Sequence, residues 1–107
     1  MRHSSPYTDA VATLNQVLET LRRLEPILRE HHVLRAGVFG SVARGDARAD
    51  SDVDILVEMG PSASLFDLSG TRLILEEALG CSVDVVSIGG MKPDIRARVL
   101  SEVRYAA

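Results

Sequence analysis

Hydrophobic positions divide the chain into segments with helical and with strand-like spacing. From Asp9 onward apolar residues recur every three to four positions as far as Leu24, which predicts an amphipathic helix with Thr8 or Asp9 as its N-cap. Pro26 interrupts the pattern and suits the first turn of a second, short helix over 26–32, because its missing N–H is not needed there. Two helices are therefore expected before the first strand.

Three short apolar segments rich in β-branched residues predict buried strands: Val33–Phe39, Val53–Glu58 and Val83–Ile88. Between the second and third strands, Leu65–Leu79 reads as a helix that Ser62 or Ser64 can cap and that Gly80 ends. Gly70 inside this helix costs about 1 kcal/mol relative to alanine. A last helix is expected to begin at Lys92 and to continue through Val103.

Composition limits the classes of protein that fit. The chain has 107 residues, of which 46% are hydrophobic and 25% charged, as expected for one domain over 1–107, with 1–8 as a flexible segment, helices over 9–32 and a core over 33–107. Cys81 is the single cysteine, which excludes an intramolecular disulfide framework and a Cys-rich zinc module. No uncharged stretch is long enough to span a membrane and the first residues lack a signal-peptide core, so we expect a cytoplasmic protein. A net charge of −3 and an aromatic fraction of 4% argue against direct binding of nucleic acid.

Two aspartates at the start of the second strand are the most informative residues. Side chains two apart on a strand share a face, so Asp52 and Asp54 point the same way. Two carboxylates that close repel each other unless a cation lies between them, and carboxylate oxygens are the ligands that Mg²⁺ prefers. The pair therefore indicates a cation site.

A third carboxylate and a Gly-Ser turn can reach the same edge of the sheet. If the third strand lies parallel beside the second, Asp84 joins the pair, and if the second runs antiparallel to the first, Gly40 and Ser41 fall there too. This requires an α+β fold with a mixed three-stranded sheet in which strand two is central. Three carboxylates opposite such a turn can hold two divalent ions for phosphoryl or nucleotidyl transfer, and Arg44 can add a forked contact to phosphate. The pattern predicts a nucleoside triphosphate site.

Two other motifs, a P-loop and an EF-hand loop, are excluded because each lacks a residue that its ligand site requires. Gly40 and Gly45 have the spacing of a P-loop, but Asp46 stands where the lysine is needed. Asp50 begins a pattern like a calcium-binding EF-hand loop, but Ile55 replaces its turn glycine. His31, His32 and Cys81 are interpreted as structural residues, and Arg48 is left open between a loop charge and a second phosphate contact.

The segment GSVARGDARADSDVDILV at 40–57 resembles the signature of the DNA polymerase β-like nucleotidyltransferase superfamily, in which Gly-Ser is followed after ten residues by Asp-x-Asp. It is most similar to the minimal nucleotidyltransferases (MNT), the antitoxin partners of HEPN-domain ribonuclease toxins, and the resemblance extends over roughly 26–105. No position of the signature is substituted. The resemblance implies the nucleotidyltransferase fold.

The resemblance also implies roles for the six signature residues. Asp52 and Asp54 would bind two Mg²⁺ ions, and Asp84 would bind the catalytic ion and help to deprotonate the attacking hydroxyl. Gly40 and Ser41 would hold the triphosphate of ATP and Arg44 would contact it. The implied reaction is AMPylation, the transfer of AMP to a tyrosine of the HEPN toxin. Larger relatives carry an extra domain that holds the acceptor, so a separate protein is expected to bring it here.

Two rival hypotheses stay open. In the first, the protein neutralises its partner by binding and masking it, without catalysis. In the second, it transfers a nucleotide to a small molecule or to an RNA end. The acidic balance and the missing acceptor domain disfavour RNA, and the lack of an obvious second pocket-forming segment disfavours a small molecule. Exposed apolar residues of the outer helices would suit either a homodimer or a toxin interface, and the sequence does not separate these two.

Overall fold

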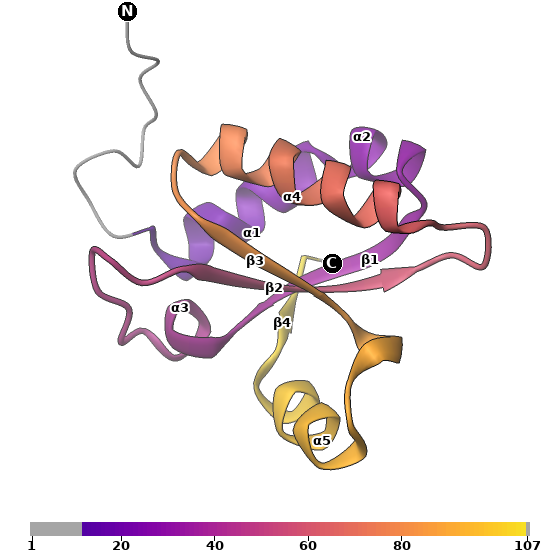
Figure 1. Ribbon diagram of the computed structural model, residues 1–107. Coiled ribbons are helices and arrows are strands. Elements are labelled where there is room, and N and C mark those ends of the chain that lie inside the picture. The colour runs from indigo at the N-terminus through magenta and orange to yellow at the C-terminus, as the bar shows by residue number, and fades with distance from the viewer. Residues whose placement is uncertain (1–11, 107) are drawn as a thin grey trace, which may run out of the picture.

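A four-stranded sheet in the order β3-β2-β1-β4 forms the centre of the computed structural model, which describes residues 12–106 (Figure 1). The strands are β1 (Val33–Phe39), β2 (Val53–Met59), β3 (Val83–Ser87) and β4 (Arg104–Tyr105). Strand β2 pairs antiparallel with β1 and parallel with β3, while β4 pairs antiparallel with β1. The expected α+β class, the mixed sheet and the place of the second strand between the first and third are confirmed.

The two faces of the sheet are covered differently. Helices α1 (Leu14–Arg23), α2 (Glu25–Glu30) and α4 (Leu65–Leu79) lie on one face (Figure 1) and enclose the main core. Along β2 the buried valines and Ile55 point into that core, so Asp54 and Leu56 point to the other face, as the period of two requires. Helices α3 (Gly40–Arg44) and α5 (Pro93–Glu102) lie there (Figure 1). The charged site can therefore form on this second face without disturbing the main core.

The first helix begins later than expected. Its N-cap is Thr13, whose hydroxyl oxygen accepts the backbone N–H of Gln16 at 3.2 Å while the Gln16 side chain accepts the N–H of Thr13 at 2.9 Å. This reciprocal pair satisfies two N–H groups that a helix leaves without partners at its start. The caps expected from the sequence, Thr8 and Asp9, lie outside the described residues. Pro26 stands in the first turn of α2, as predicted.

Helix α4 has the bounds predicted from the sequence. Of the two serines considered, Ser64 is the cap, since it accepts the N–H of Asp67, and Gly80 ends the helix in the left-handed conformation with a φ of 69°. Gly70 does not interrupt the helix, and a Cβ there would lie 3.0 Å from the ring of His31. The glycine thus makes room for a histidine of another element. In the described part of the chain, no helix is both long and apolar enough to cross a bilayer.

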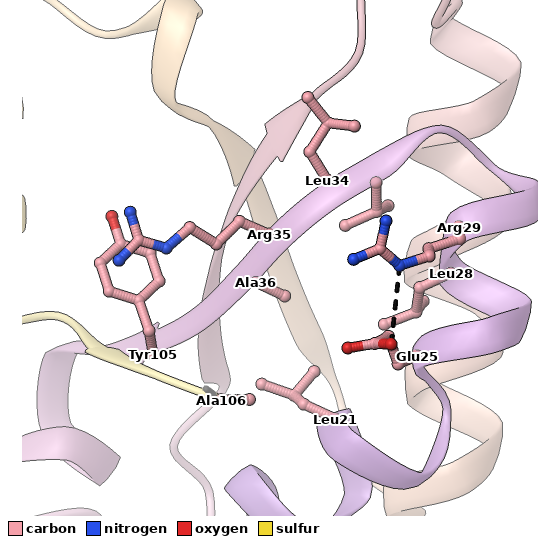
Figure 2. Close-up of a pocket in the computed structure, with 10 residues that line it drawn as sticks. Leu21, Glu25, Leu28, Arg29, Leu34, Arg35, Ala36, Tyr105 and Ala106 are labelled. Carbon is pink, nitrogen blue, oxygen red and sulfur yellow. Dashed lines mark ion pairs between the residues drawn. The ribbon is translucent and has the colours of Figure 1, made fainter.

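The prediction of three strands was wrong by one. Helix α5 ends at Glu102, and Val103, which was expected to continue it, is extended with a ψ of 139°. The next two residues form β4 against β1, where Gly37 allows the close approach: a Cβ at position 37 would lie 2.8 Å from Val103 and 2.9 Å from the Arg104 carbonyl. The guanidinium of Arg35 lies 3.5 Å from the centre of the Tyr105 ring (Figure 2), a contact that also holds β4.

Candidate functional site

A cleft of about 630 Å³ lies on the second face of the sheet, where β1 ends and β2 begins. That volume falls within the roughly 300–1,000 Å³ of ordinary small-ligand sites. Five of the six predicted site residues line it: Gly40, Ser41, Arg44, Asp52 and Asp54. Helix α5 closes the other side with Arg98, Val99 and Glu102. The cleft is therefore built from segments at 39–44, 51–54 and 98–102, which the fold brings together.

Gly40 is required by the geometry of the turn that follows β1. Its φ is +72°, a region that side chains rarely occupy, and a Cβ at this position would collide with Oδ2 of Asp54. The carboxylate of Asp54 thus packs directly against the backbone of the turn. This close approach follows from the pairing of Phe39, the last residue of β1, with Asp54. The Gly-Ser turn and the aspartate of β2 form one surface.

The three predicted carboxylates lie near one another but do not form a closed cluster. Asp84 on β3 is the in-register neighbour of Asp54 on β2, and it is exposed and not among the residues that line the cleft. Burial raises the pKa of Asp54 above its ordinary value, and repulsion from Asp84 and then from Asp52 raises it further, while Arg44 opposes the shift. Within residues 12–106, no three histidine, cysteine, aspartate or glutamate side chains are close enough, as they stand, to hold a metal ion. The donor chemistry nevertheless fits a hard cation, since all three groups are carboxylates whose repulsion a cation would relieve.

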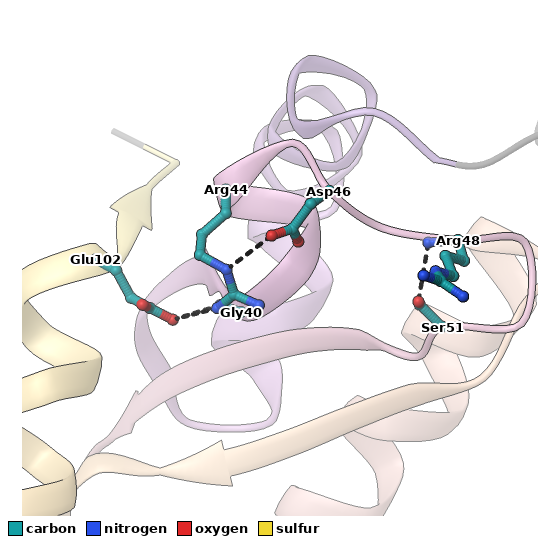
Figure 3. A network of polar contacts seen from close by, with 6 residues as sticks. All are labelled: Gly40, Arg44, Asp46, Arg48, Ser51 and Glu102. Atoms are coloured by element: carbon teal, nitrogen blue, oxygen red, sulfur yellow. Dashed lines mark hydrogen bonds and ion pairs between the residues drawn. The ribbon is translucent and has the colours of Figure 1, made fainter.

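Arg44 connects the turn to helix α5. Its guanidinium lies 3.3 Å from Oδ2 of Asp46 and 3.3 Å from Oε1 of Glu102 (Figure 3). The same oxygen of Glu102 accepts the backbone N–H of Gly40 at 2.9 Å. One carboxylate oxygen therefore receives both a backbone N–H and a guanidinium that were predicted to bind phosphate.

Sequence reasoning did not identify Arg98 or Glu102. They lie one turn apart on α5 and so share a face, but nothing in their spacing indicated that this face meets α3. It also missed Glu76, whose carboxylate accepts the N–H of Val83 at 3.2 Å and so fixes the start of β3 beside Asp84. The charge of Glu76 also acts on Cys81. Burial is the main cause that raises the pKa of the Cys81 thiol, and the charges of Glu76 and then of Asp52 raise it further.

None of the residues interpreted as structural (His31, His32 and Cys81) lines the cleft. His31 faces α4, with its Nδ1 3.8 Å from Oδ1 of Asp67. Arg48 is exposed and its backbone N–H donates to Ser51 Oγ at 2.9 Å (Figure 3), which leaves the role of its side chain a prediction. A second cavity, bordered by α1, α2, β1 and the end of the chain (Figure 2), contains none of the predicted site residues.

Comparison with known proteins points to one family. The sequence profile of the nucleotidyltransferase domain matches residues 14–106. A Methanocaldococcus jannaschii protein named as a candidate protein adenylyltransferase is 45% identical over 84 residues, which are 78% of this chain and 90% of that protein. The protein adenylyltransferase MntA of Thermococcus cleftensis is 41% identical over 97 residues, 90% of this chain and 98% of its own length.

Solved structures agree with the fold. The structure of a candidate minimal nucleotidyltransferase has a TM-score of 0.78 and 39% identity, and the match covers 87% of this chain and 95% of that one. The complex of a tri-AMPylated Shewanella oneidensis HEPN toxin with its MNT antitoxin has a TM-score of 0.62 and covers 85% of this chain and 71% of that one. Its identity is 17%, so this second likeness concerns the fold alone.

Proposed function

The chain belongs to the nucleotidyltransferase domain family, and from that premise we propose that it transfers AMP from ATP to a tyrosine hydroxyl of a HEPN-type toxin and acts as its antitoxin. Relatives at 41% and 45% identity carry the name protein adenylyltransferase, which supports AMP as the transferred group. An MNT antitoxin of the same fold occurs in complex with an AMPylated HEPN toxin, which supports the class of partner. The protein is a nucleotidyltransferase, and the proposed parts are its acceptor, its toxin partner and its metal ions.

The observation that carries the proposal is the cleft in which the Gly-Ser turn faces Asp52 and Asp54. Gly40 lines the cleft without a side chain, Ser41 adds a hydroxyl, and Arg44 adds a guanidinium suited to forked contacts with phosphate oxygens. Without a cation, carboxylates directly opposite a phosphate-binding turn would be unfavourable, since they repel the phosphate that the turn binds. Such an arrangement favours a ligand that arrives with cations, as ATP does.

Asp52, Asp54 and Asp84 would hold the divalent ions, which we propose to be two Mg²⁺. The charged groups that line the cleft are three carboxylates (Asp52, Asp54, Glu102) and two guanidinium groups (Arg44, Arg98), a net charge of −1 before ATP enters. Bound Mg²⁺ would neutralise the negative charge of the triphosphate and stabilise the oxygens that attack and leave. The residues that hold it are oxygen donors only, as this ion prefers.

The chain's own residues would then divide the work of one displacement. Gly40, Ser41 and Arg44 orient the triphosphate, so that the tyrosine oxygen forms a bond to the α-phosphorus as the bond to the β-phosphate oxygen breaks and pyrophosphate leaves. Asp84 takes part in removing the proton of the attacking hydroxyl. Its exposed position suits this role, because an acceptor presented by a separate protein has to reach it from solvent.

The test is transfer of label from ATP to the partner. The protein, a co-encoded HEPN protein and Mg²⁺ are incubated with ATP labelled on the α-phosphate, with γ-labelled ATP in a parallel reaction. We expect covalent α-label on the partner, no γ-label, and label lost when tyrosine is replaced there. Asp52→Asn with Asp54→Asn should reduce the rate by at least about a hundredfold, while Asp50→Asn, an exposed aspartate of the same loop, should retain it.

The two rival hypotheses give different results in the same experiment. A stable complex without α-label, in which Asp84→Ala neutralises the partner as well as the wild type does, would favour masking and overturn the proposed transfer. Label on RNA or on a small molecule instead of the partner would identify a different acceptor. The cytoplasmic location stays a prediction, and the two alternatives for the exposed apolar residues of the outer helices, a homodimer or a toxin interface, stay open.

A further inference from the structure

The carboxylate of Glu102 is bound at the Gly-Ser turn by two of the groups that the proposed function assigns to the phosphates of the substrate. Its Oε1 accepts the backbone N–H of Gly40 at 2.9 Å and lies 3.3 Å from Nη1 of Arg44 (Figure 3). These two donors come from α3, fifty-eight to sixty-two residues away in sequence from the last residue of α5. The contact is therefore a tertiary one, made by a side chain that is 28% exposed.

This contact is electrostatically opposed from the other side of the cleft. The charge of Glu102 is one of the causes that raise the pKa of Asp54, so the two carboxylates repel each other across the turn. A carboxylate that stays there despite this repulsion is held by its two donors, since hydrogen bonds involving charged groups are the strong ones. Those donors are the groups that the proposed function assigns to the triphosphate.

Arg98 offers the carboxylate another partner when it leaves the turn. It lies four residues before Glu102 on the same face of α5, and both side chains line the cleft. A rotation of the Glu102 side chain toward Arg98 would release the N–H of Gly40 and one contact of Arg44 without moving a backbone element. Rotation of the Glu102 side chain alone would therefore free the two donors at the turn for a ligand.

We propose that Glu102 is an internal competitor for the phosphate groups of the nucleotide: it occupies the turn in the ligand-free protein and must leave Gly40 and Arg44 for the triphosphate to bind. This inference rests on the proposed function for the identity of the ligand. It makes Glu102 a residue that sets nucleotide affinity, and so the concentration of ATP at which the protein acts. It also gives helix α5 a part in binding that the Gly-Ser and Asp-x-Asp motifs do not contain.

The experiment measures binding by calorimetry, in Mg²⁺, of three probes: AMP-PNP, inorganic tripolyphosphate and adenosine. Glu102→Gln keeps the shape of the side chain and removes its charge, so we expect tripolyphosphate and AMP-PNP to bind about five- to tenfold more tightly. Adenosine, which has no phosphate, should bind as it does to the wild type. Asp94→Asn removes one negative charge from an exposed position of the same helix and should change none of the three affinities.

A second variant separates occupation of the turn from simple repulsion. Glu102→Asp keeps the charge but shortens the side chain by one methylene, so it cannot reach both donors and should tighten phosphate binding as well. Tightening in Glu102→Gln alone would mean repulsion by charge and would overturn the proposal, as would tighter adenosine binding or unchanged tripolyphosphate binding in both variants. Failure of the wild-type protein to bind AMP-PNP at all would instead count against the proposed function.

Discussion

At the level of single residues, the distinguishing feature of the cleft is a group of negative charges that lie close together. The backbone around the Asp54 carboxylate leaves it no room to move away from its neighbours. Asp54 is fixed against Gly40 on one side and beside Asp84 on the other. Its raised pKa records first the burial and then the repulsion from its neighbours. A folded protein that keeps such a group ionised loses stability, because the unfolded chain spreads the same charges apart.

Replacement of Asp54 by asparagine should therefore stabilise the ligand-free protein at neutral pH. Because the pKa is higher in the folded than in the unfolded state, the folded state binds more protons between the ordinary pKa of 3.8 and the raised pKa. The free energy of unfolding consequently falls as pH rises through that window. Asp54→Asn removes this loss, so its melting temperature in EDTA should exceed that of the wild type at pH 7, and the advantage should disappear below about pH 3.8.

The matched control is Asp50→Asn, an exposed aspartate in the loop before β2. It removes the same charge without relieving the contact with Gly40, so its difference from the wild type should be small at every pH. An Asp54→Asn protein that is less stable than the wild type at pH 7 would show that burial and repulsion of the Asp54 carboxylate do not destabilise the fold.

At the level of elements, the sequence predicts the parts whose cause is local. Ser64, Gly80 and the apolar run between them specify α4 to the residue, since caps and periodicity act within one helix. The two-residue strand β4 has no comparable signal: Arg104 and Tyr105 are held by pairing with β1 and by Arg35, all tertiary contacts. Val103, directly before β4, continues the helical spacing of α5, and docking beside Gly37 overrides that preference.

The short approach of Gly70 in α4 to the His31 ring allows a test of whether His31 is the reason for a glycine inside this helix. Replacing a glycine inside a helix by alanine stabilises it by about 1 kcal/mol when nothing opposes the new methyl group. Here the methyl group would lie 3.0 Å from the His31 ring, so that gain should be reduced in the wild type and restored in a His31→Ala background. A double-mutant cycle from urea unfolding should then give a coupling of about 0.5 kcal/mol or more between the two positions. Additive effects would mean that His31 does not account for the glycine.

At the level of the whole molecule, the sequence predicts those parts of the site that strand pairing alone brings together. An antiparallel β1–β2 pair and a parallel β2–β3 pair suffice to bring the Gly-Ser turn, Asp54 and Asp84 to one edge, and both pairings follow from the motif once strand order is assumed. Arg98 and Glu102 depend on how α5 crosses the second face, where Leu56 and Val99 are buried outside the main core. Those two residues look like any apolar positions in the sequence, and so the contribution of α5 could not be foreseen.

Binding should connect this site to the stability of the entire fold. A ligand that binds only the folded state raises the free energy of unfolding by about 2.7 kcal/mol at a hundred times its dissociation constant, or about 10 °C or more in melting temperature for a chain of this size. Because the cleft lining carries a net negative charge, AMP-PNP with Mg²⁺ should produce this shift, whereas AMP-PNP in EDTA should produce a much smaller one. Asp52→Asn with Asp54→Asn should lose the Mg²⁺-dependent part while still unfolding cooperatively. An equal shift with and without Mg²⁺ would mean that the carboxylates hold no cation for the nucleotide, and that the Gly-Ser turn and Arg44 bind its phosphates without one.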